Sequence, residues 1–251
     1  MASEPYSPDS WQHLKQFTAA RIALGRAGSS LTTSQLLAFQ QAHAQARDAV
    51  HTPLDAQKLA DELSGFNLPV LPLHSRAADR ATYLQRPDLG RRLDEASVHR
   101  LRALPAGEYD ISLVVADGLS ALAVQGHTGG LFAELIPALL ADSYRLAPLC
   151  VVEQGRVAVG DEIGGLLHSR LVVIFIGERP GLSSPDSLGI YLTFQPQTGL
   201  TDERRNCISN VRPDGLPSAF AAQKLRYLIR ESLRKQLSGV QLKDEQHLSL
   251  E

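Results

Sequence analysis

The sequence has 251 residues, of which 43% are hydrophobic and 21% are charged, and its formal net charge is −2. This composition can bury a core in one large domain, or in a main domain and a small one, which excludes a disordered chain. The charge balance provides no concentrated basic face for a nucleic-acid backbone, and the apolar runs are too short to span a membrane. Two cysteines, Cys150 and Cys207, give no disulfide framework, so we expect a reduced, cytoplasmic-type compartment.

The first third of the sequence predicts helices. Helix-capping residues, glycines and prolines delimit four of them, at 11–22, 33–50, 55–65 and 94–104. The segment 68–74 is apolar and contains two prolines, a pattern that favours an extended segment at the edge of a sheet. The N-terminal residues MASEPYSPDSW lack the basic start and the apolar stretch of a secretory signal.

After residue 107 the pattern changes to an alternation of strand, loop and helix. Apolar segments predict strands at 109–116, 149–152, 171–176 and 188–194, and helices are expected at 131–144, 161–168 and 218–237. Continuous apolar strands separated by helices are typical of sheets covered on both faces. We therefore expect an α/β fold: a Rossmann-like, open and mostly parallel sheet with helices on both faces at 108–251, preceded by a small helical N-terminal domain at 1–107.

Four polar loops of the expected sheet are candidates for a binding site, because ligands of such sheets lie beyond the carboxyl ends of the strands. They read DGLS at 117–120, QGRV at 154–157, GERPGL at 177–182 and RRNCISN at 204–210. Structural interpretations remain open for the first two. Asp117 and Ser120 suit a helix cap, and Asp161 and Glu162 suit a helix N-terminus.

The loop at 177–182 most favours a binding role. Glu178 follows a buried strand, where its carboxylate could accept hydrogen bonds from amide or hydroxyl groups of a ligand, or could pair with Arg179 or another neighbour. Pro180 and Gly181 predict a rigid turn. Cys207 has no histidine beside it in sequence to act as a base, so a contact role or a place in the core suits it better than a nucleophilic role.

The sequence lacks the motifs of several common catalytic classes. It contains neither G-x-G-x-x-G nor G-x-x-x-x-G-K-[ST], which counts against binding of NAD or ATP. Its eight histidines are scattered, without H-E-x-x-H, and no G-x-S-x-G occurs, which counts against a zinc site and a serine hydrolase. The sequence therefore predicts binding groups at strand ends, with no catalytic set of acid, base and nucleophile and no metal ligand.

Six short segments, spread over nearly the whole chain, match the pattern of one known family. They are ARIALGRAG at 20–28, YLQRPDLGRRL at 83–93, VVADGLSA at 114–121, GRV at 155–157, GERPGL at 177–182 and CISN at 207–210. In this order they resemble the small, or light, subunit of ethanolamine ammonia-lyase. The second and fifth segments are long enough to be specific.

The resemblance implies an adenosylcobalamin-dependent lyase that converts ethanolamine to acetaldehyde and ammonia. It also implies that a large TIM-barrel subunit holds the substrate, while the small subunit, with its Rossmann-like domain, covers the cobalamin from the other side. The small subunit would be inactive alone. The two subunits would form a hetero-oligomer with up to six copies of each, in the cytoplasm or inside a bacterial microcompartment.

Carried over position by position, the family's cofactor contacts fall on Val157, Glu178 and Cys207. The interval between the last two is one residue shorter here than in the family's pattern. The D-x-H-x-x-G pattern, which supplies a histidine to cobalt in other cobalamin proteins, is absent. From the resemblance we therefore expect that no residue of this chain ligates the metal.

The helical region at 1–107 would contact the large subunit. Within it, Arg86, Arg91 and Arg92 suit interface or cofactor-tail contacts, salt bridges or a solvated surface. Two further interpretations of the whole chain are a structural subunit that holds a catalytic partner without touching the cofactor, and an independent α/β enzyme that uses a nucleotide. The absent phosphate loops count against the second of these.

Overall fold

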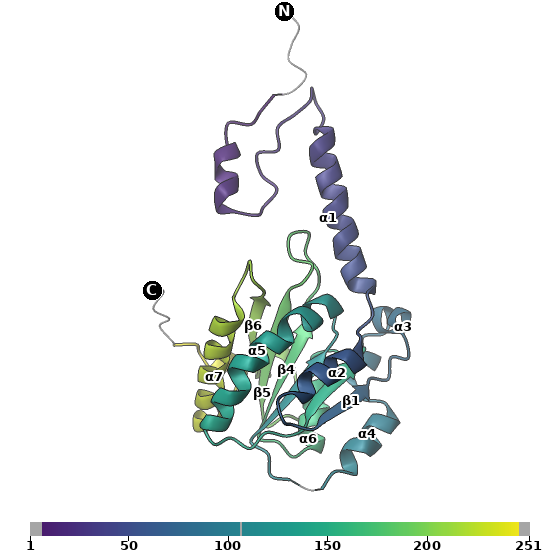
Figure 1. Cartoon of the computed structure of the whole chain (residues 1–251), viewed down its shortest axis with the longest axis vertical. Coiled ribbons are helices and arrows are strands. Elements are labelled where there is room, and N and C mark those ends of the chain that lie inside the picture. The colour runs from purple at the N-terminus through teal and green to yellow at the C-terminus, as the bar shows by residue number, and fades with distance from the viewer. Residues whose placement is uncertain (1–6, 106, 246–251) are drawn as a thin grey trace, which may run out of the picture.

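The computed structural model describes residues 7–105 and 107–245, which form an α/β body and an N-terminal arm that rises from it (Figure 1). The arm, residues 7–51, contains the short 3-10 helix η1 (Gln12–Phe17) and the long helix α1 (Thr33–His51). The body contains α2 (Ala56–Ser64), β1 (Val70–His74), α3 (Arg80–Gln85), η2 (Leu89–Arg91), α4 (Glu95–Arg102), β2 (Ile111–Ala116), α5 (Ala121–Ala141), β3 (Leu149–Glu153), α6 (Val159–Leu166), β4 (Leu171–Gly177), β5 (Leu188–Phe194), η3 (Asp202–Arg204), β6 (Arg205–Val211), α7 (Ser218–Lys235) and η4 (Gly239–Gln241).

One six-stranded sheet, in the order β1-β3-β2-β4-β5-β6, organises the body. Strands β1, β3, β2 and β4 run parallel, whereas β5 and β6 are antiparallel to their neighbours. The expected α/β fold is thus confirmed, and the sheet is mixed. The antiparallel strands follow from the short links at 178–187 and 195–204, because a parallel crossover needs about a dozen residues or more and usually a helix.

The two edges of the sheet carry sequences suited to edge positions. Strand β1 lies at one edge, as predicted for 68–74, and contains Pro72, which has no N–H to donate to a neighbouring strand. Strand β6, at the other edge, covers most of the segment that we expected to be a loop at 204–210. That expectation is wrong because an edge strand with an exposed face can carry many polar residues. The division of the chain at residue 107 stays a prediction, although β1 joins the sheet from the first part.

Buried side chains on both faces of the sheet form two core clusters. Leu113 and Val115 of β2 point to the face covered by α2, α5 and α7, whereas Val114 and Ala116 point to the face covered by α4 and α6 (Figure 1). Period-two alternation within a strand that is buried on both faces explains why β2 is apolar at nearly every position. The prediction of helices on both faces is confirmed.

Some predicted helix boundaries were wrong. Helix α5 begins at Ala121, ten residues before the expected start, because Ser120 accepts a hydrogen bond from the Ala123 N–H and packing against the sheet and α7 outweighs three glycines in its first half. The expected helix at 11–22 is only the 3-10 helix η1, which buries none of its residues and so gains nothing from packing. No helix in the described ranges is long and apolar enough to cross a membrane.

The arm touches the body at the loop between β4 and β5. Arg21 donates a hydrogen bond to the carbonyl oxygen of Leu182 at 3.0 Å, and its guanidinium lies 6.0 Å from the ring of Phe39 on α1. Helix α1 buries only Ala42 and Ala49. Most of the arm therefore presents its side chains outward.

The turn after β2 is a place where only glycine fits. Gly118 has φ +55°, and a Cβ there would lie 2.2 Å from the carbonyl oxygen of Gly177 at the end of β4. We expect Gly118→Ala to lower the free energy of unfolding by about 2–4 kcal/mol, measured by urea denaturation. The control is Gly126→Ala in α5, where a Cβ meets no atom within 4 Å, so stability should hold or rise by about 1 kcal/mol. Equal losses in the two variants would contradict the steric explanation.

Candidate functional site

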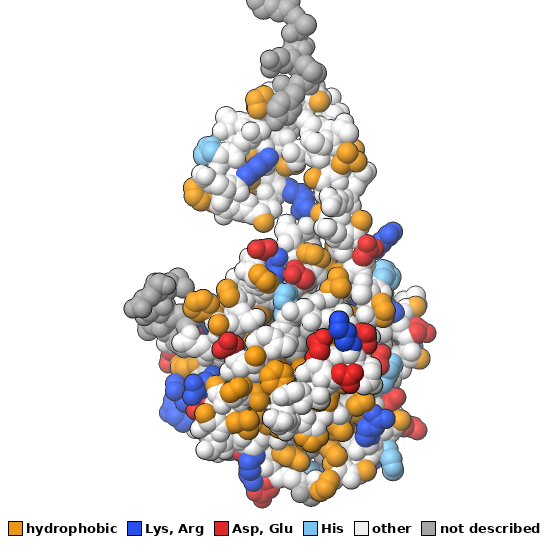
Figure 2. Space-filling model, viewed as in Figure 1, with side chains coloured by type: hydrophobic (Ala, Val, Ile, Leu, Met, Phe, Trp, Pro, Cys, Tyr) orange, Lys and Arg blue, Asp and Glu red, His pale blue; other side chains and the backbone are white. Residues whose placement is uncertain are grey.

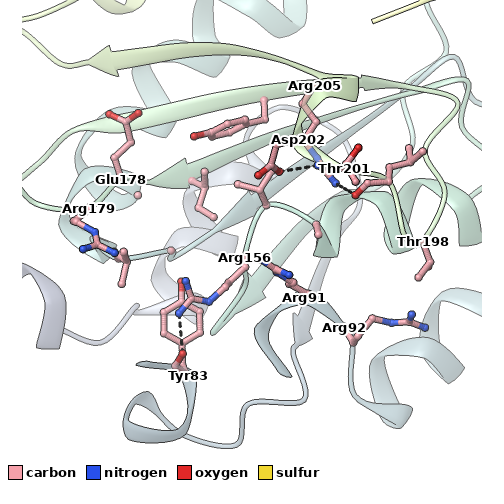
Figure 3. A pocket seen from close by; sticks show the side chains of 18 of the residues that line it. Tyr83, Arg91, Arg92, Arg156, Glu178, Arg179, Thr198, Thr201, Asp202 and Arg205 are labelled. Atoms are coloured by element: carbon pink, nitrogen blue, oxygen red, sulfur yellow. Dashed lines mark hydrogen bonds and ion pairs between the residues drawn. The ribbon is translucent and has the colours of Figure 1, made fainter. Parts of the chain in front are cut away.

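A cleft of about 840 Å³ opens at the carboxyl ends of the parallel strands (Figure 3). Its walls come from α3 and η2, from the loops after β2, β3 and β4, and from β5 and the segment that leads into β6. The lining residues are Tyr83, Arg91, Arg92, Gly118, Leu119, Arg156, Val157, Ala158, Ile176, Gly177, Glu178, Arg179, Tyr191, Thr198, Gly199, Leu200, Thr201, Asp202 and Arg205. Three of the four loops proposed from the sequence meet here, because β2, β3 and β4 are adjacent and parallel.

A buried carboxylate ties two of these loops together beneath the cleft. Asp117 accepts hydrogen bonds from the N–H groups of Gln154 and Gly155, both at 3.0 Å. Arg80 lies 3.5 Å from the same carboxylate and donates to the carbonyl oxygen of Gly118 at 2.8 Å. Of the two proposed capping residues, only Ser120 caps α5, whereas Asp117 links the β2 loop to the β3 loop.

Burial raises the pKa of Asp117 to about 6, against the lowering effects of the Gln154 N–H, the Arg80 charge and the Gly155 N–H. The folded chain therefore binds this proton more tightly than the unfolded chain, whose ordinary pKa lies near 4. As the pH rises from about 4 to about 6, the contribution of Asp117 to the free energy of unfolding falls.

We expect an NMR titration of the Asp117 carboxyl to show a midpoint near pH 6, because burial raises its pKa to about 6. We also expect Asp117→Asn to remove the fall in stability that this group causes between about pH 4 and 6. At neutral pH the variant should be less stable by about 1–3 kcal/mol, because its amide NH₂ meets the Gln154 or Gly155 N–H without accepting from it. Denaturation of both proteins at several pH values measures these effects. A titration midpoint near 4 would contradict the assignment.

Val157 lies where β3 turns into α6 and lines the cleft, as the sequence predicted for this loop. The helix begins without a side-chain cap, since its N-cap residue is Ala158. Asp161 and Glu162 lie in the first turn of the helix, as expected, and also form long-range ion pairs. Such pairs join residues far apart in the chain, so sequence spacing gave no signal of them.

Two ion pairs fix α6 to opposite walls of the cleft. Asp161 pairs with Arg205, and both side chains are buried; Arg205 also donates to Asp202 at 2.8 Å and to the carbonyl oxygen of Leu200 at 3.1 Å. The guanidinium thereby holds the wall at 198–202 against α6. Desolvation raises the pKa of Asp161, and the Arg205 charge opposes this rise.

The second ion pair joins Glu162 to Arg92, one of the three arginines whose roles the sequence left open. Glu162 accepts from two Arg92 side-chain nitrogens, Nε at 3.2 Å and Nη2 at 3.0 Å, and from the backbone N–H of Leu93 at 2.8 Å. Arg86 pairs with its neighbour Asp88 at 2.7 Å on the surface. Arg91 is exposed and lines the cleft.

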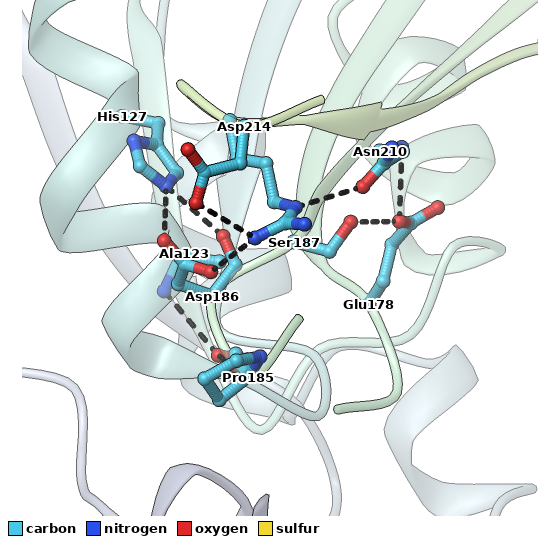
Figure 4. Close-up of polar contacts among 10 residues, drawn as sticks. Ala123, His127, Glu178, Pro185, Asp186, Ser187, Asn210 and Asp214 are labelled. Atoms are coloured by element: carbon cyan, nitrogen blue, oxygen red, sulfur yellow. Dashed lines mark hydrogen bonds and ion pairs between the residues drawn. The ribbon is translucent and has the colours of Figure 1, made fainter. Parts of the chain in front are cut away.

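Glu178 lines the cleft and is braced by the end of β6 (Figure 4). Its carboxylate accepts hydrogen bonds from the hydroxyls of Ser187 and Ser209, both at 2.5 Å, and from the Asn210 N–H at 3.1 Å. Its partners are thus hydroxyl and amide donors, and the pairing with Arg179 considered from the sequence is not among them. The predicted turn after it is present, since Gly181 exchanges two backbone hydrogen bonds with Ser184.

A chain of polar contacts extends this brace to α5 (Figure 4). Asn210 accepts from Arg212 at 3.0 Å, Arg212 lies 3.6 Å from Asp186, and Asp186 lies 3.3 Å from His127 Nε2. The contacts hold the β4–β5 loop, the end of β6 and α5 in one arrangement. The position of Glu178 therefore depends on residues from three separate parts of the chain.

Cys207 lies on strand β6, beside the cleft and outside its lining. It is paired across the sheet with Tyr191, which does line the cleft, and the two side chains share a hydrogen bond. Desolvation raises the pKa of the Cys207 thiol, so the group stays protonated and lacks the thiolate needed of a nucleophile. Tyr191 was not among the residues predicted from the sequence, although an aromatic hydroxyl in the mostly apolar β5 was a usable signal.

Within residues 7–105 and 107–245, no group of three or more His, Cys, Asp or Glu side chains could hold a metal ion. The cleft instead combines apolar surface from Leu119, Val157 and Ile176 with dispersed arginines and two carboxylates. This arrangement suits the binding of a large ligand with several polar groups.

Comparison with known proteins identifies relatives over almost the whole chain. The family model described as ethanolamine ammonia-lyase light chain (EutC) matches residues 8–243. The chain is 61% identical to the ethanolamine ammonia-lyase small subunit of Pseudomonas paraeruginosa, over 94% of this chain and 87% of that protein. It is 61% identical to the small subunit of Azotobacter vinelandii and 58% identical to that of Ralstonia nicotianae, in each case over 96% of this chain and 90% of the relative.

Proposed function

Since the chain belongs to the ethanolamine ammonia-lyase light-chain family, we propose that it is the small subunit of an adenosylcobalamin-dependent ethanolamine ammonia-lyase, a carbon–nitrogen lyase. The observation that carries the proposal is the cleft at the carboxyl ends of β2, β3 and β4, in which Val157 and Glu178 lie together. In this proposal the cleft forms one wall of the cofactor site. A large subunit forms the other wall and holds ethanolamine.

The residues of the cleft fit a broad macrocycle fringed with amides. Its volume of about 840 Å³ lies within the range of about 300–1,000 Å³ typical of ligand pockets. Val157 and Tyr191 offer surface for packing, and Glu178 keeps acceptor capacity for amide N–H groups because each carboxylate oxygen has two lone pairs. Cys207, beside Tyr191, would meet the edge of the ring. The bound cofactor would supply the cobalt–carbon bond whose homolysis begins the reaction.

This chain's part is to position the cofactor and to keep water from it. In this proposal no residue of the chain ligates cobalt or acts as acid, base or nucleophile. The small subunit is therefore inactive alone and works in a hetero-oligomer with the large subunit, with up to six copies of each. We place this complex in the cytoplasm, where a bacterial microcompartment could enclose it.

We also infer that the arm belongs to the surface that contacts the large subunit. Trp11 and Phe17 are 63% and 76% exposed, and Leu31, Leu37 and Phe39 are exposed as well. Figure 2 shows hydrophobic side chains spread over the arm as well as the body. Exposed aromatic and leucine side chains gathered on a thin segment are typical of a contact surface, because a partner can bury them.

The proposed role of Glu178 is tested in the complex reconstituted with the large subunit. We expect Glu178→Ala to weaken adenosylcobalamin binding about tenfold, which corresponds to one lost hydrogen bond to a charged group, and to lower ammonia release at limiting cofactor. Spectral titration of the cofactor measures the affinity. Glu134→Ala, which removes an exposed carboxylate from α5, is the control. Unchanged affinity and activity in Glu178→Ala would refute the cofactor contact and favour a purely structural subunit.

The proposed role of the arm is tested by co-purification. We expect Trp11→Ala combined with Phe17→Ala to weaken binding of the large subunit at least tenfold, because aromatic side chains buried at interfaces contribute strongly to affinity. Both side chains are exposed in this chain, so its own stability should not change. Leu140→Ala, at an exposed position of α5, is the control. Equal retention of the large subunit by the double variant and the control would count against the arm as an interface.

A further inference from the structure

The charges that line the cleft are unequal. Five arginines and two carboxylates contribute to its lining. Arg92 and Arg205 are neutralised by their ion pairs with α6 and with Asp202. The other three, Arg91, Arg156 and Arg179, form no ion pair with a carboxylate of the described residues. Glu178 is the one remaining lining carboxylate, so an excess of positive charge faces the cleft.

Arg156 lies between the other two arginines that form no ion pair, and contacts with Tyr83 hold it in place (Figure 3). Its Nη2 donates to the carbonyl oxygen of Tyr83 at 2.9 Å, and its guanidinium lies 4.4 Å from the centre of the Tyr83 ring. Its buried Nε has no hydrogen-bond partner among the described residues, which is costly. The side chain is therefore positioned by Tyr83 while its charge remains uncompensated.

Arg91 is brought beside Arg156 by a close backbone contact. The Arg156 N–H donates to the carbonyl oxygen of Gly90 at 2.8 Å, and a Cβ on Gly90 would lie 3.0 Å from Arg156 Cγ. Gly90 thus lets η2 pack directly on the loop before α6. The two guanidinium groups approach the cleft from adjacent segments (Figure 3).

The start of α6 adds donors at the same place. Val157 and Ala158 line the cleft, and neither backbone N–H donates to another backbone or side-chain group of the described residues. The helix has no side-chain cap, so these N–H groups remain available to a ligand in the cleft that the two residues line. Two guanidinium groups beside free N–H groups at a helix start are the donor set that binds phosphate.

We propose that Arg91, Arg156 and the N–H groups of Val157 and Ala158 form a binding site for a phosphodiester anion, within the cleft and distinct from Glu178. This inference rests on the proposed function, since the nucleotide tail of cobalamin contains one phosphodiester. Arg156 would donate through the guanidinium N–H groups that Tyr83 does not occupy, and Arg91 would donate from the end of η2. Glu178, on the other side of the cleft, would serve the amides of the ring, so that ring and tail contact different residues.

The test compares cobalamin with cobinamide, which has the corrin ring but lacks the nucleotide and its phosphodiester. In the complex reconstituted with the large subunit, we expect Arg91→Gln to weaken cobalamin binding about tenfold and to leave cobinamide binding unchanged. The Arg91 guanidinium forms no hydrogen bond or ion pair with a described residue, so the substitution should not disturb the fold. Arg156→Lys keeps the charge but loses the fixed fork of donors, and should show a smaller loss for cobalamin alone. Arg102→Gln, outside the cleft, is the control for charge.

Each outcome decides between defined alternatives. Equal weakening of cobalamin and cobinamide by Arg91→Gln, or no weakening of either, would overturn the phosphodiester site. If inorganic phosphate at millimolar concentration competes with cobalamin in the wild-type complex and not in Arg91→Gln, the phosphate chemistry is supported. If cobinamide binding depends on Glu178 while the Arg91 variant has no effect, the proposed function stands and only this site fails. If the binding of cobalamin and the binding of cobinamide are both independent of every residue of the cleft, the proposed function itself fails.

Discussion

The two N–H groups at the start of the β3–α6 loop both donate to the carboxylate of Asp117, and the arrangement of the cleft depends on this contact. The group is buried, and burial of a charge without partners is costly. Asp117 offsets that cost with two backbone donors and with Arg80 at 3.5 Å. The ends of β2 and β3 are thus fixed relative to each other, and Gly118 then allows the β2 loop to contact the end of β4. Burial nevertheless outweighs these partners and raises the pKa of Asp117.

Helix α6 is held between two walls of the cleft by carboxylates in its first turn. Asp161 reaches Arg205 on β6, and Glu162 reaches Arg92 after η2. A buried pair of this kind contributes little to stability once desolvation is counted, but the loss of one partner leaves a buried charge and is strongly destabilising. We therefore interpret Asp161 and Arg205 chiefly as a device that fixes the position of the wall at 198–202, to which Arg205 also donates.

The sequence was sufficient for those parts of the fold that depend on local pattern. Continuous apolar runs located β2, β3, β4 and β5, and the two prolines of 68–74 identified an edge strand. The loops with Val157 and Glu178 were located because parallel neighbours bring their carboxyl ends together. Strand β6 was missed because its sequence, RNCISNV, is mostly polar and lacks a clear alternation of apolar and polar residues. The early start of α5 was missed because glycines normally disfavour a helix.

The contacts that give the site its shape could not be predicted from the sequence, because they join residues that lie far apart in the chain. Arg205 and Asp161 lie 44 residues apart, and Glu178 meets Ser209 across 31 residues. Each such pair depends on the register of strands far apart in the chain, which no local pattern encodes. Arg91 and Arg92 illustrate the limit, since adjacent and chemically identical side chains have different environments. Arg92 faces Glu162, whereas Arg91 faces the cleft.

The fold relates to its proposed function through two sets of polar groups: carboxylates that are paired within the chain, and donors that are left unpaired in the cleft. Three carboxylates form hydrogen bonds or ion pairs within the chain, and these contacts position the loops. They are Asp117, Asp161 and Glu162. The donors that remain are on Arg91, on Arg156 and on the two residues before α6. Arg156 is held by the Tyr83 ring and by its backbone contact with Gly90. Donors already in place lose little freedom when a ligand binds, so they contribute more of their interaction energy to affinity. A chain without a catalytic set can in this way still determine how a cofactor is held.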